Sequence, residues 1–165
     1  MSPLDIDIIR AKMSIILDNL KALEPIKEMS RDEYLRDLYK RKATERLLQE
    51  LLEAALDINT HIVVGSGYAP PDDYYQSFIR AGELGFLSPG LAEKLAPSAG
   101  LGNRLVHEYD RIDHAIILKA VMMAEELYPE YVEEISAVLS RQAEYCLQGS
   151  NPTSNRDTPK PRIKF

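Results

Sequence analysis

The stretch that decides the fold is LLQELLEAALDINTHIVVG, which spans residues 47–65. Its apolar side chains recur every three or four positions, as on one face of an α-helix: Leu47, Leu51, Ala54, Ile58 and Ile62. The stripe begins upstream, after Ser30 and Glu33, whose types and spacing are those of a capping box. It ends at Gly65, a residue type common just past helix ends. The span predicts one long helix, or two helices divided near residues 39–42.

The same spacing predicts the other helices, over residues 2–23, 72–84, 88–107 and 113–145. Ser-Pro pairs open the first and third of these, because Ser caps a helix and Pro suits its first turn. Pro97 predicts a kink in the third, and Pro129 predicts either a kink in the last or its division into two. The sequence has no strand pattern. An all-α bundle of about five helices is therefore expected.

The chain has 165 residues, of which 45% are hydrophobic and 28% charged, as in one soluble globular domain. At this length about 70% of the unfolded chain's surface can be buried on folding, so the core needs neither a metal nor a disulfide. We expect the bundle to span residues 1–148. Residues 149–165 are rich in Pro, Asn, Ser and Thr and are expected to form a flexible tail.

Composition also bears on location and on binding class. The only cysteine, Cys146, has no partner in the chain for a disulfide, which fits the cytoplasm. No apolar run approaches the roughly 18 residues of a membrane span, so no membrane association is expected. The net charge of -6 argues against nonspecific coating of DNA, which depends on neutralising phosphates. It leaves room for a local nucleic-acid site.

Positive charge gathers in two stretches. Residues 31–46 hold six Lys or Arg against four acidic residues, and residues 151–165 hold four against one. Solvated helix faces are the simpler interpretation of each. Arg46 is nevertheless a candidate for holding RNA, with an ion pair to Glu50, four residues further on, as the alternative.

Conventional enzyme sites find little support in the sequence. His61 follows Asp57 by four residues, which places both on one helix face and predicts that they pair within the bundle. A zinc site needs three or four ligands, and the three histidines and one cysteine have no spacing that completes a set. No Gly-x-Ser-x-Gly motif indicates a nucleophilic triad. We therefore expect no metal site and no cofactor.

The most informative polar cluster lies at residues 99–110, AGLGNRLVHEYD. On an ideal helix Asn103 and Arg104 lie four and three residues before His107, so the three side chains share a face. An imidazole beside a cation and an amide is suited to moving a proton while developing phosphate charge is stabilised. A purely structural polar network is the alternative.

The run LGNRLVHEYDRID, residues 101–113, resembles the signature of the HepT-like toxins of the HEPN superfamily. That signature is an Arg, usually followed by Asn, then a His several residues on and a Tyr two residues beyond it. Residues 42–49 and 57–62 also resemble the family's second helix, and residues 75–78 the segment before its third helix. The resemblance implies an all-α HEPN bundle that forms a homodimer.

The resemblance further implies a metal-independent RNase, with tRNA as the preferred substrate, whose motifs face each other across a cleft in the dimer. It implies a minimal nucleotidyltransferase as antitoxin, which transfers AMP to the motif's tyrosine. The family's His corresponds to His107, its Asn to Asn103 and its AMP-accepting Tyr to Tyr109. The family's Arg falls on Gly102. Further candidates for lining the cleft or holding RNA are Arg104, Arg46, Asp57 and His61.

Glycine at position 102 allows two interpretations. The chain is either an inactivated form of a toxin that its host could not otherwise tolerate, or a natural variant in which Arg104 substitutes or activity is lost. We favour the first, because the neighbouring motif residues are in place. Two non-enzymatic functions stay open: a helical dimer that docks the nucleotidyltransferase and accepts AMP on Tyr109, and a plain helical interaction module.

Overall fold

A computed structural model describes residues 4–107 and 112–149, and every regular element in these residues is helical. The elements are α1 (Ile6–Lys27), α2 (Arg31–Arg36), α3 (Leu38–Gly65), α4 (Tyr74–Glu83), α5 (Pro89–Leu95), α6 (Ser98–His107) and α7 (His114–Gly149). The prediction of an all-α fold is confirmed. No helix within the described ranges is long and apolar enough to cross a membrane.

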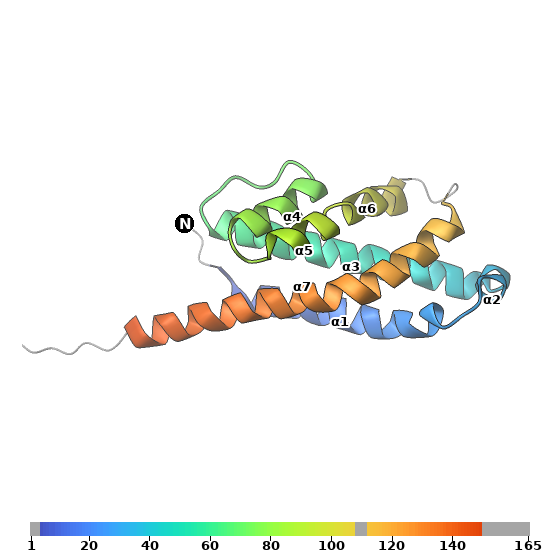
Figure 1. Cartoon of the computed structure of the whole chain (residues 1–165), viewed down its shortest axis with the longest axis horizontal. Coiled ribbons are helices and arrows are strands. Elements are labelled where there is room, and N and C mark those ends of the chain that lie inside the picture. Colours follow the sequence, from blue (N-terminus) through green and yellow to red (C-terminus); the bar gives the residue numbers. More distant parts are fainter. Residues whose placement is uncertain (1–3, 108–111, 150–165) are drawn as a thin grey trace, which may run out of the picture.

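The three long helices α1, α3 and α7 run along the length of the molecule (Figure 1). Helix α1 packs against both α3 and α7, and the short helices α4, α5 and α6 cover one side of this group. Helix α2 lies at one end, beside the start of α3 (Figure 1). At the other end α7 projects past the bundle. Helix α6, which carries the polar cluster, packs against α3 and α4.

Polar caps set where most of the helices begin. Ser30 and Glu33 form the predicted capping box at α2. The Asp73 side chain caps α4 by accepting the backbone N–H of Gln76. The division of the long stripe falls at Asp37 rather than at residues 39–42, because the Asp37 side chain caps α3 by accepting the Lys40 N–H. An extended backbone at Asp37 separates α2 from α3.

The two inner prolines act differently. Pro97 separates α5 from α6, where a single kinked helix was expected. Pro129 lies inside α7, which runs unbroken from His114 to Gly149. Because Pro129 is exposed, the backbone hydrogen bond that proline cannot donate is missing at the surface of the helix rather than in the apolar core. The divisions at Pro97 and at Asp37 give seven helical segments in the described residues instead of about five.

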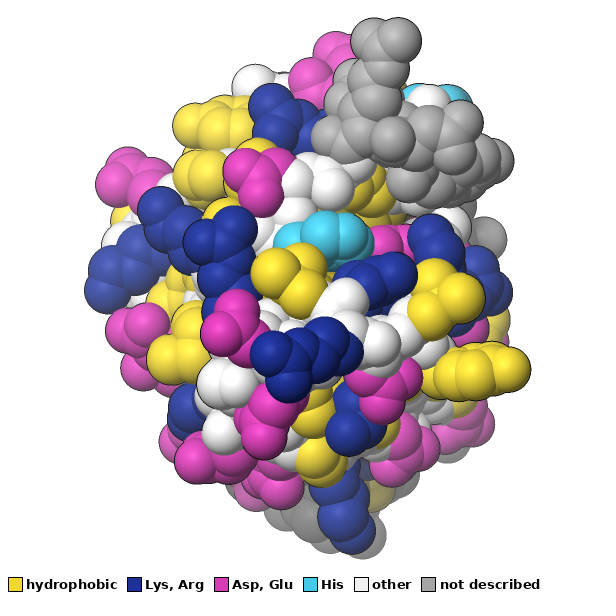
Figure 2. Space-filling view, turned by 90° about the vertical axis from the view of Figure 1, so that its right-hand side faces the viewer, with side chains coloured by type: hydrophobic (Ala, Val, Ile, Leu, Met, Phe, Trp, Pro, Cys, Tyr) yellow, Lys and Arg dark blue, Asp and Glu magenta, His cyan; other side chains and the backbone are white. Residues whose placement is uncertain are grey.

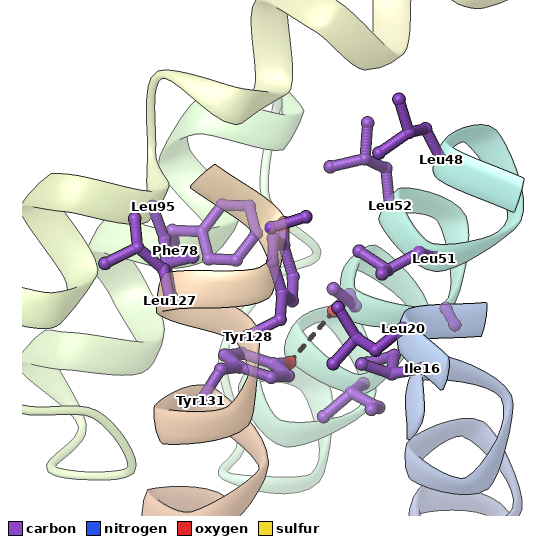
Figure 3. Packing of buried hydrophobic residues seen from close by; sticks show 14 of the residues in the cluster. Ile16, Leu20, Leu48, Leu51, Leu52, Phe78, Leu95, Leu127, Tyr128 and Tyr131 are labelled. Atoms are coloured by element: carbon purple, nitrogen blue, oxygen red, sulfur yellow. Dashed lines mark hydrogen bonds between the residues drawn. The ribbon is translucent and has the colours of Figure 1, made fainter. Parts of the chain in front are cut away.

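Tyr128 and Tyr131 of α7 are buried in the core, and Figure 3 shows the Tyr131 hydroxyl pointing toward α3. The Tyr131 hydroxyl donates to the Asn59 side-chain oxygen at 2.8 Å and approaches the Ala55 carbonyl at 3.2 Å. Asn59 in turn donates to the Ser77 hydroxyl of α4 at 3.2 Å. A satisfied polar chain thus links α7, α3 and α4 through the centre of the bundle.

Replacing Tyr131 with Phe is expected to lower the free energy of unfolding by about 2 kcal/mol, because it leaves the buried Asn59 oxygen without its donor. Urea unfolding followed by circular dichroism measures the loss. Tyr145→Phe is the matched control, since Tyr145 is exposed on the projecting end of α7. Equal stabilities for the two variants would contradict the role given to this hydrogen bond.

Buried phenols make the fold sensitive to high pH. Burial raises the pKa of Tyr34 to about 12, with a smaller contribution from Glu45, and burial also raises the pKa of Tyr128 and Tyr131. Since the folded pKa values lie above the ordinary value of 10.0, the stability that these neutral phenols contribute is complete below that pH. It is lost as the pH rises through the folded pKa values. As the pH rises from about 10 to about 12, the midpoint of thermal unfolding should fall, and it should fall less in the Tyr34→Phe variant.

Candidate functional site

The candidate site is one face of α6. Asn103, Arg104 and His107 are exposed, whereas Gly102 and Leu105 are buried. The helical spacing predicted that the first three share a face, and the structure confirms this geometry. His107 is the last residue of α6, so its imidazole lies at the end of the helix, three residues after Arg104 and four after Asn103. A phosphate bound to this face could contact an amide, a guanidinium and an imidazole able to transfer a proton.

A buried contact fixes the start of α6 on α7. The Ser98 hydroxyl donates to the Leu95 carbonyl at 2.6 Å and lies 3.0 Å from the Tyr128 hydroxyl. Both side chains are almost fully buried. Because Ser98 begins α6, this contact sets where the exposed residues of the helix stand relative to α7.

Position 102 faces inward, between α3 and α4. A Cβ on Gly102 would lie 3.2 Å from Cε2 of Tyr74 and 3.7 Å from a methyl group of Leu52. The first distance is tighter than an ordinary contact, so the Tyr74 ring would have to move by a few tenths of an ångström to admit a side chain. A side chain at this position would begin between α3 and α4, against Leu52 and Tyr74. Tyr74 is therefore a neighbour of the motif that the sequence did not indicate.

Asp57 and His61 lie elsewhere, and the predicted pair between them is wrong. Asp57 forms an ion pair with Lys12 of α1, with Nζ and Oδ2 2.5 Å apart. His61 Nε2 accepts the backbone N–H of Asp5 at 3.0 Å, at the start of α1. Relative to Leu52, which faces α6, His61 points about 180° away around α3. The contacts of both residues are thus with α1 and the residue before it, and their assignment as cleft-lining residues stays a prediction.

Arg46 also has a partner on its own helix. Its Nε lies 2.8 Å from Glu50 Oε1, which is the ion pair expected from their spacing as the alternative to RNA binding. Lys40 pairs with Asp37, and Lys42 with Glu45. Figure 2 looks onto the end of the bundle that carries α2 and the start of α7, where Lys and Arg side chains are interspersed with acidic ones. This end is a surface of mixed charge rather than a uniformly basic patch.

Two predictions fall outside the described residues: Tyr109 as the AMP acceptor, and residues 150–165 as a flexible tail. Gly149, assigned to the tail, is the last residue of α7. Within residues 4–107 and 112–149, no cluster of three or more His, Cys, Asp or Glu side chains could hold a metal ion.

Known structures define the class of this bundle. The tri-AMPylated HEPN toxin of Shewanella oneidensis, solved in complex with its MNT antitoxin, superimposes with a TM-score of 0.71 at 24% identity. The match covers 79% of this chain and 98% of that one. YutE of Bacillus subtilis, a cytosolic protein of unknown function, gives a TM-score of 0.74 at 15% identity, with 86% and 95% covered. The fold is thus that of the HEPN toxins.

Sequence comparison defines the family. A family model described as Ribonuclease HepT-like matches residues 16–135. The tRNA nuclease HepT of Aphanizomenon flos-aquae is 42% identical over 135 residues, which are 80% of this chain and 90% of that protein. The chain belongs to the HepT-like ribonuclease family.

Proposed function

We propose that the protein is the RNase toxin of a toxin–antitoxin pair in the cytoplasm, that it acts on tRNA, and that it acts as a homodimer without a metal. The observation that carries the proposal is the exposed face of α6, where Asn103, Arg104 and His107 stand together. The 42% identity to a tRNA nuclease supports the choice of substrate. The partner is a minimal nucleotidyltransferase, by analogy with the complex of the Shewanella oneidensis toxin.

In the proposed reaction the 2′-hydroxyl of the RNA attacks the adjacent phosphorus. The bond to the 5′-oxygen breaks, leaving a 2′,3′-cyclic phosphate on one fragment and a 5′-hydroxyl on the other. His107 serves as the general base that removes the proton of the 2′-hydroxyl, or as the acid that protonates the leaving oxygen. Asn103 and an arginine at position 102 would stabilise the charge on the phosphorane.

Gly102 impairs this chemistry in the present chain. Glycine has no side chain to balance the extra negative charge of the transition state. Arg104, three residues before His107, is the nearest exposed cation on α6 and is a partial substitute in the natural-variant interpretation. Because positions 102 and 104 point to different sides of the helix, the Arg104 guanidinium would approach the RNA phosphate from another direction than an arginine at position 102. We propose that the chain is a weakened or inactive nuclease whose other motif residues are retained.

The second candidate function is that of a non-catalytic helical dimer that docks the nucleotidyltransferase and accepts AMP. The buried glycine favours it, because the acceptor role needs Tyr109 and does not need a cation at position 102. In either function, AMP on Tyr109 adds bulk and negative charge two residues from His107. It would repel an RNA phosphate from the same site.

Tyr109→Phe is expected to abolish AMP transfer to this chain, because phenylalanine has no hydroxyl to accept the nucleotide. The measurement is incorporation of radiolabel from α-labelled ATP in the presence of the nucleotidyltransferase. Tyr75→Phe is the control, since Tyr75 is an exposed tyrosine on α4 and should leave labelling unchanged. Undiminished labelling of Tyr109→Phe would contradict the assignment of the acceptor.

A further inference from the structure

An open groove of about 620 Å³ lies between α6 and α7, directly beside the candidate site. Its floor is apolar and includes Leu101 of α6 together with Ala120 and Met123 of α7. Arg104, one of the exposed motif residues, lines the same groove. Small-molecule sites have volumes of about 300–1,000 Å³, so the groove is large enough for such a ligand. An RNA held at the α6 face would pass directly along it.

Glycine at position 100 keeps the groove open. Gly100 lies within α6 and lines the groove, and a Cβ built on it would meet no other atom within 4 Å. Glycine inside a helix costs about 1 kcal/mol relative to alanine, and no neighbouring atom requires it here. Because Gly100 is exposed, a side chain at this position would extend into the groove. The open space therefore favours a groove that receives a ligand.

The groove has a cationic end and an acidic end. Helix α6 runs toward the end of the bundle where α7 begins, so the two helices run in opposite directions along the groove (Figure 1). Arg104 and Lys119 therefore line the end nearer His107. Glu126 lines the opposite end, near Ser98, the first residue of α6. In the part of the chain that the structure describes, none of the three charged side chains that line the groove forms an ion pair.

This arrangement of charge suits a nucleotide. The two cations can contact phosphates, which are the groups that Lys and Arg bind in nucleic acids. The apolar floor can cover the face of a base, and the thioether of Met123 makes favourable contacts with aromatic rings. The carboxylate at the far end can accept a hydrogen bond from the amino group of a base. Cations placed beside the proton-transfer group favour RNA over a protein as the occupant.

We infer that the α6–α7 groove binds a nucleobase of the substrate RNA that carries an amino group, next to the phosphate at the α6 face. Glu126 accepts the hydrogen bond of the amino group, and Arg104 and Lys119 contact the flanking phosphates. Cytosine meets this requirement, whereas uracil has a carbonyl oxygen in place of the amino group. The inference rests on the proposed RNase function and adds to it a preference among RNA sequences.

The test is the binding of two short RNAs, oligo(C) and oligo(U), to the full chain, measured by fluorescence anisotropy at fixed salt with a chelator present. The chain should bind oligo(C) about tenfold more tightly than oligo(U), the effect of one base-edge contact. Glu126→Gln should reduce this ratio to about twofold or less, because an amide can pair with either base. The ratio is the readout, since the lost negative charge changes the affinity for both RNAs alike.

Gly100→Leu fills the groove and should weaken the binding of oligo(C) by about tenfold, to the level of oligo(U). Gly90→Leu is the matched control and should change neither affinity. Gly90 is an exposed glycine of α5, its Cβ would also meet no atom within 4 Å, and it lies outside the groove. Both variants should keep their thermal stability, because leucine favours a helix more than glycine does.

Equal affinity of the parent chain for the two RNAs would overturn the inference, as would a ratio that Glu126→Gln and Gly100→Leu leave unchanged. A Gly100→Leu variant that alters self-association and leaves RNA binding as it was would also overturn it, because the groove would then receive protein. Cleavage by Gly102→Arg with no preference between the RNAs would overturn the inference and leave the nuclease function standing. A preference that depends on Glu126, without cleavage by Gly102→Arg, would support the groove and count against the nuclease function alone.

Discussion

Gly102→Arg is expected to raise the rate of RNA cleavage by about two to three orders of magnitude, the usual effect of one well-placed group that stabilises transition-state charge. The guanidinium would supply the cation that the α6 face lacks at this position. The measurement is the initial rate of cleavage of total tRNA, with a chelator present, by equal amounts of the chain and of the variant.

The ring of Tyr74 obstructs a side chain at position 102. Its Cβ would meet the Tyr74 ring at 3.2 Å, so the ring has to yield before the arginine can extend outward. The double variant Gly102→Arg/Tyr74→Leu removes this obstacle and should cleave at least as fast as Gly102→Arg. Gly102→Gln is the neutral control, which meets the same ring without bringing a charge, and it should gain no activity.

Thermal unfolding of each variant separates a failure of chemistry from a failure of folding. A folded Gly102→Arg that cleaves no faster than the parent chain would count against the inactivated-toxin interpretation. It would leave the natural-variant interpretation and the AMP-acceptor function in place.

His107→Ala in the Gly102→Arg background is expected to reduce the regained cleavage by about two to four orders of magnitude, the range found for a general acid or base. His107 is exposed at the end of α6, so its removal should cost little stability. The readout is the dependence of the cleavage rate on pH. The shape of this pH profile should differ between the variant that lacks His107 and the variant that retains it.

His61→Ala in the same background is the matched control. This imidazole accepts a hydrogen bond from the start of α1 and lies away from the α6 face. Its loss should lower stability slightly and leave the pH profile of cleavage unchanged. If His107→Ala retained both the rate and the pH profile, His107 would not be the proton-transfer group.

Local signals in the sequence predicted much of the fold. The capping box at Ser30 and the stripe of residues 47–62 predicted α2 and most of α3, because these features act within one or two turns. The break at Asp37 was misplaced because a continuous apolar stripe obscures a single capping side chain. Pro97 was given a weaker effect than it has, since proline ends some helices and only bends others.

The site was predictable only where its residues are close together in the sequence. Spacing alone placed Asn103, Arg104 and His107 on one face. The contacts that surround them come from distant parts of the chain: Tyr74 against Gly102, and Tyr128 against Ser98. Asp57 and His61 do share a side of α3, but their partners belong to α1, and helical periodicity carries no information about such partners.

Mass spectrometry of the RNA ends that Gly102→Arg produces from one purified tRNA, in the presence of chelator, tests the nuclease function most directly. The proposed reaction yields fragments that end in a 2′,3′-cyclic phosphate, matched by fragments that begin with a 5′-hydroxyl, and none of either when His107 is also replaced with alanine. Intact tRNA from folded Gly102→Arg, with AMP still transferred to Tyr109, would contradict the nuclease function and identify the chain as an AMP-accepting partner.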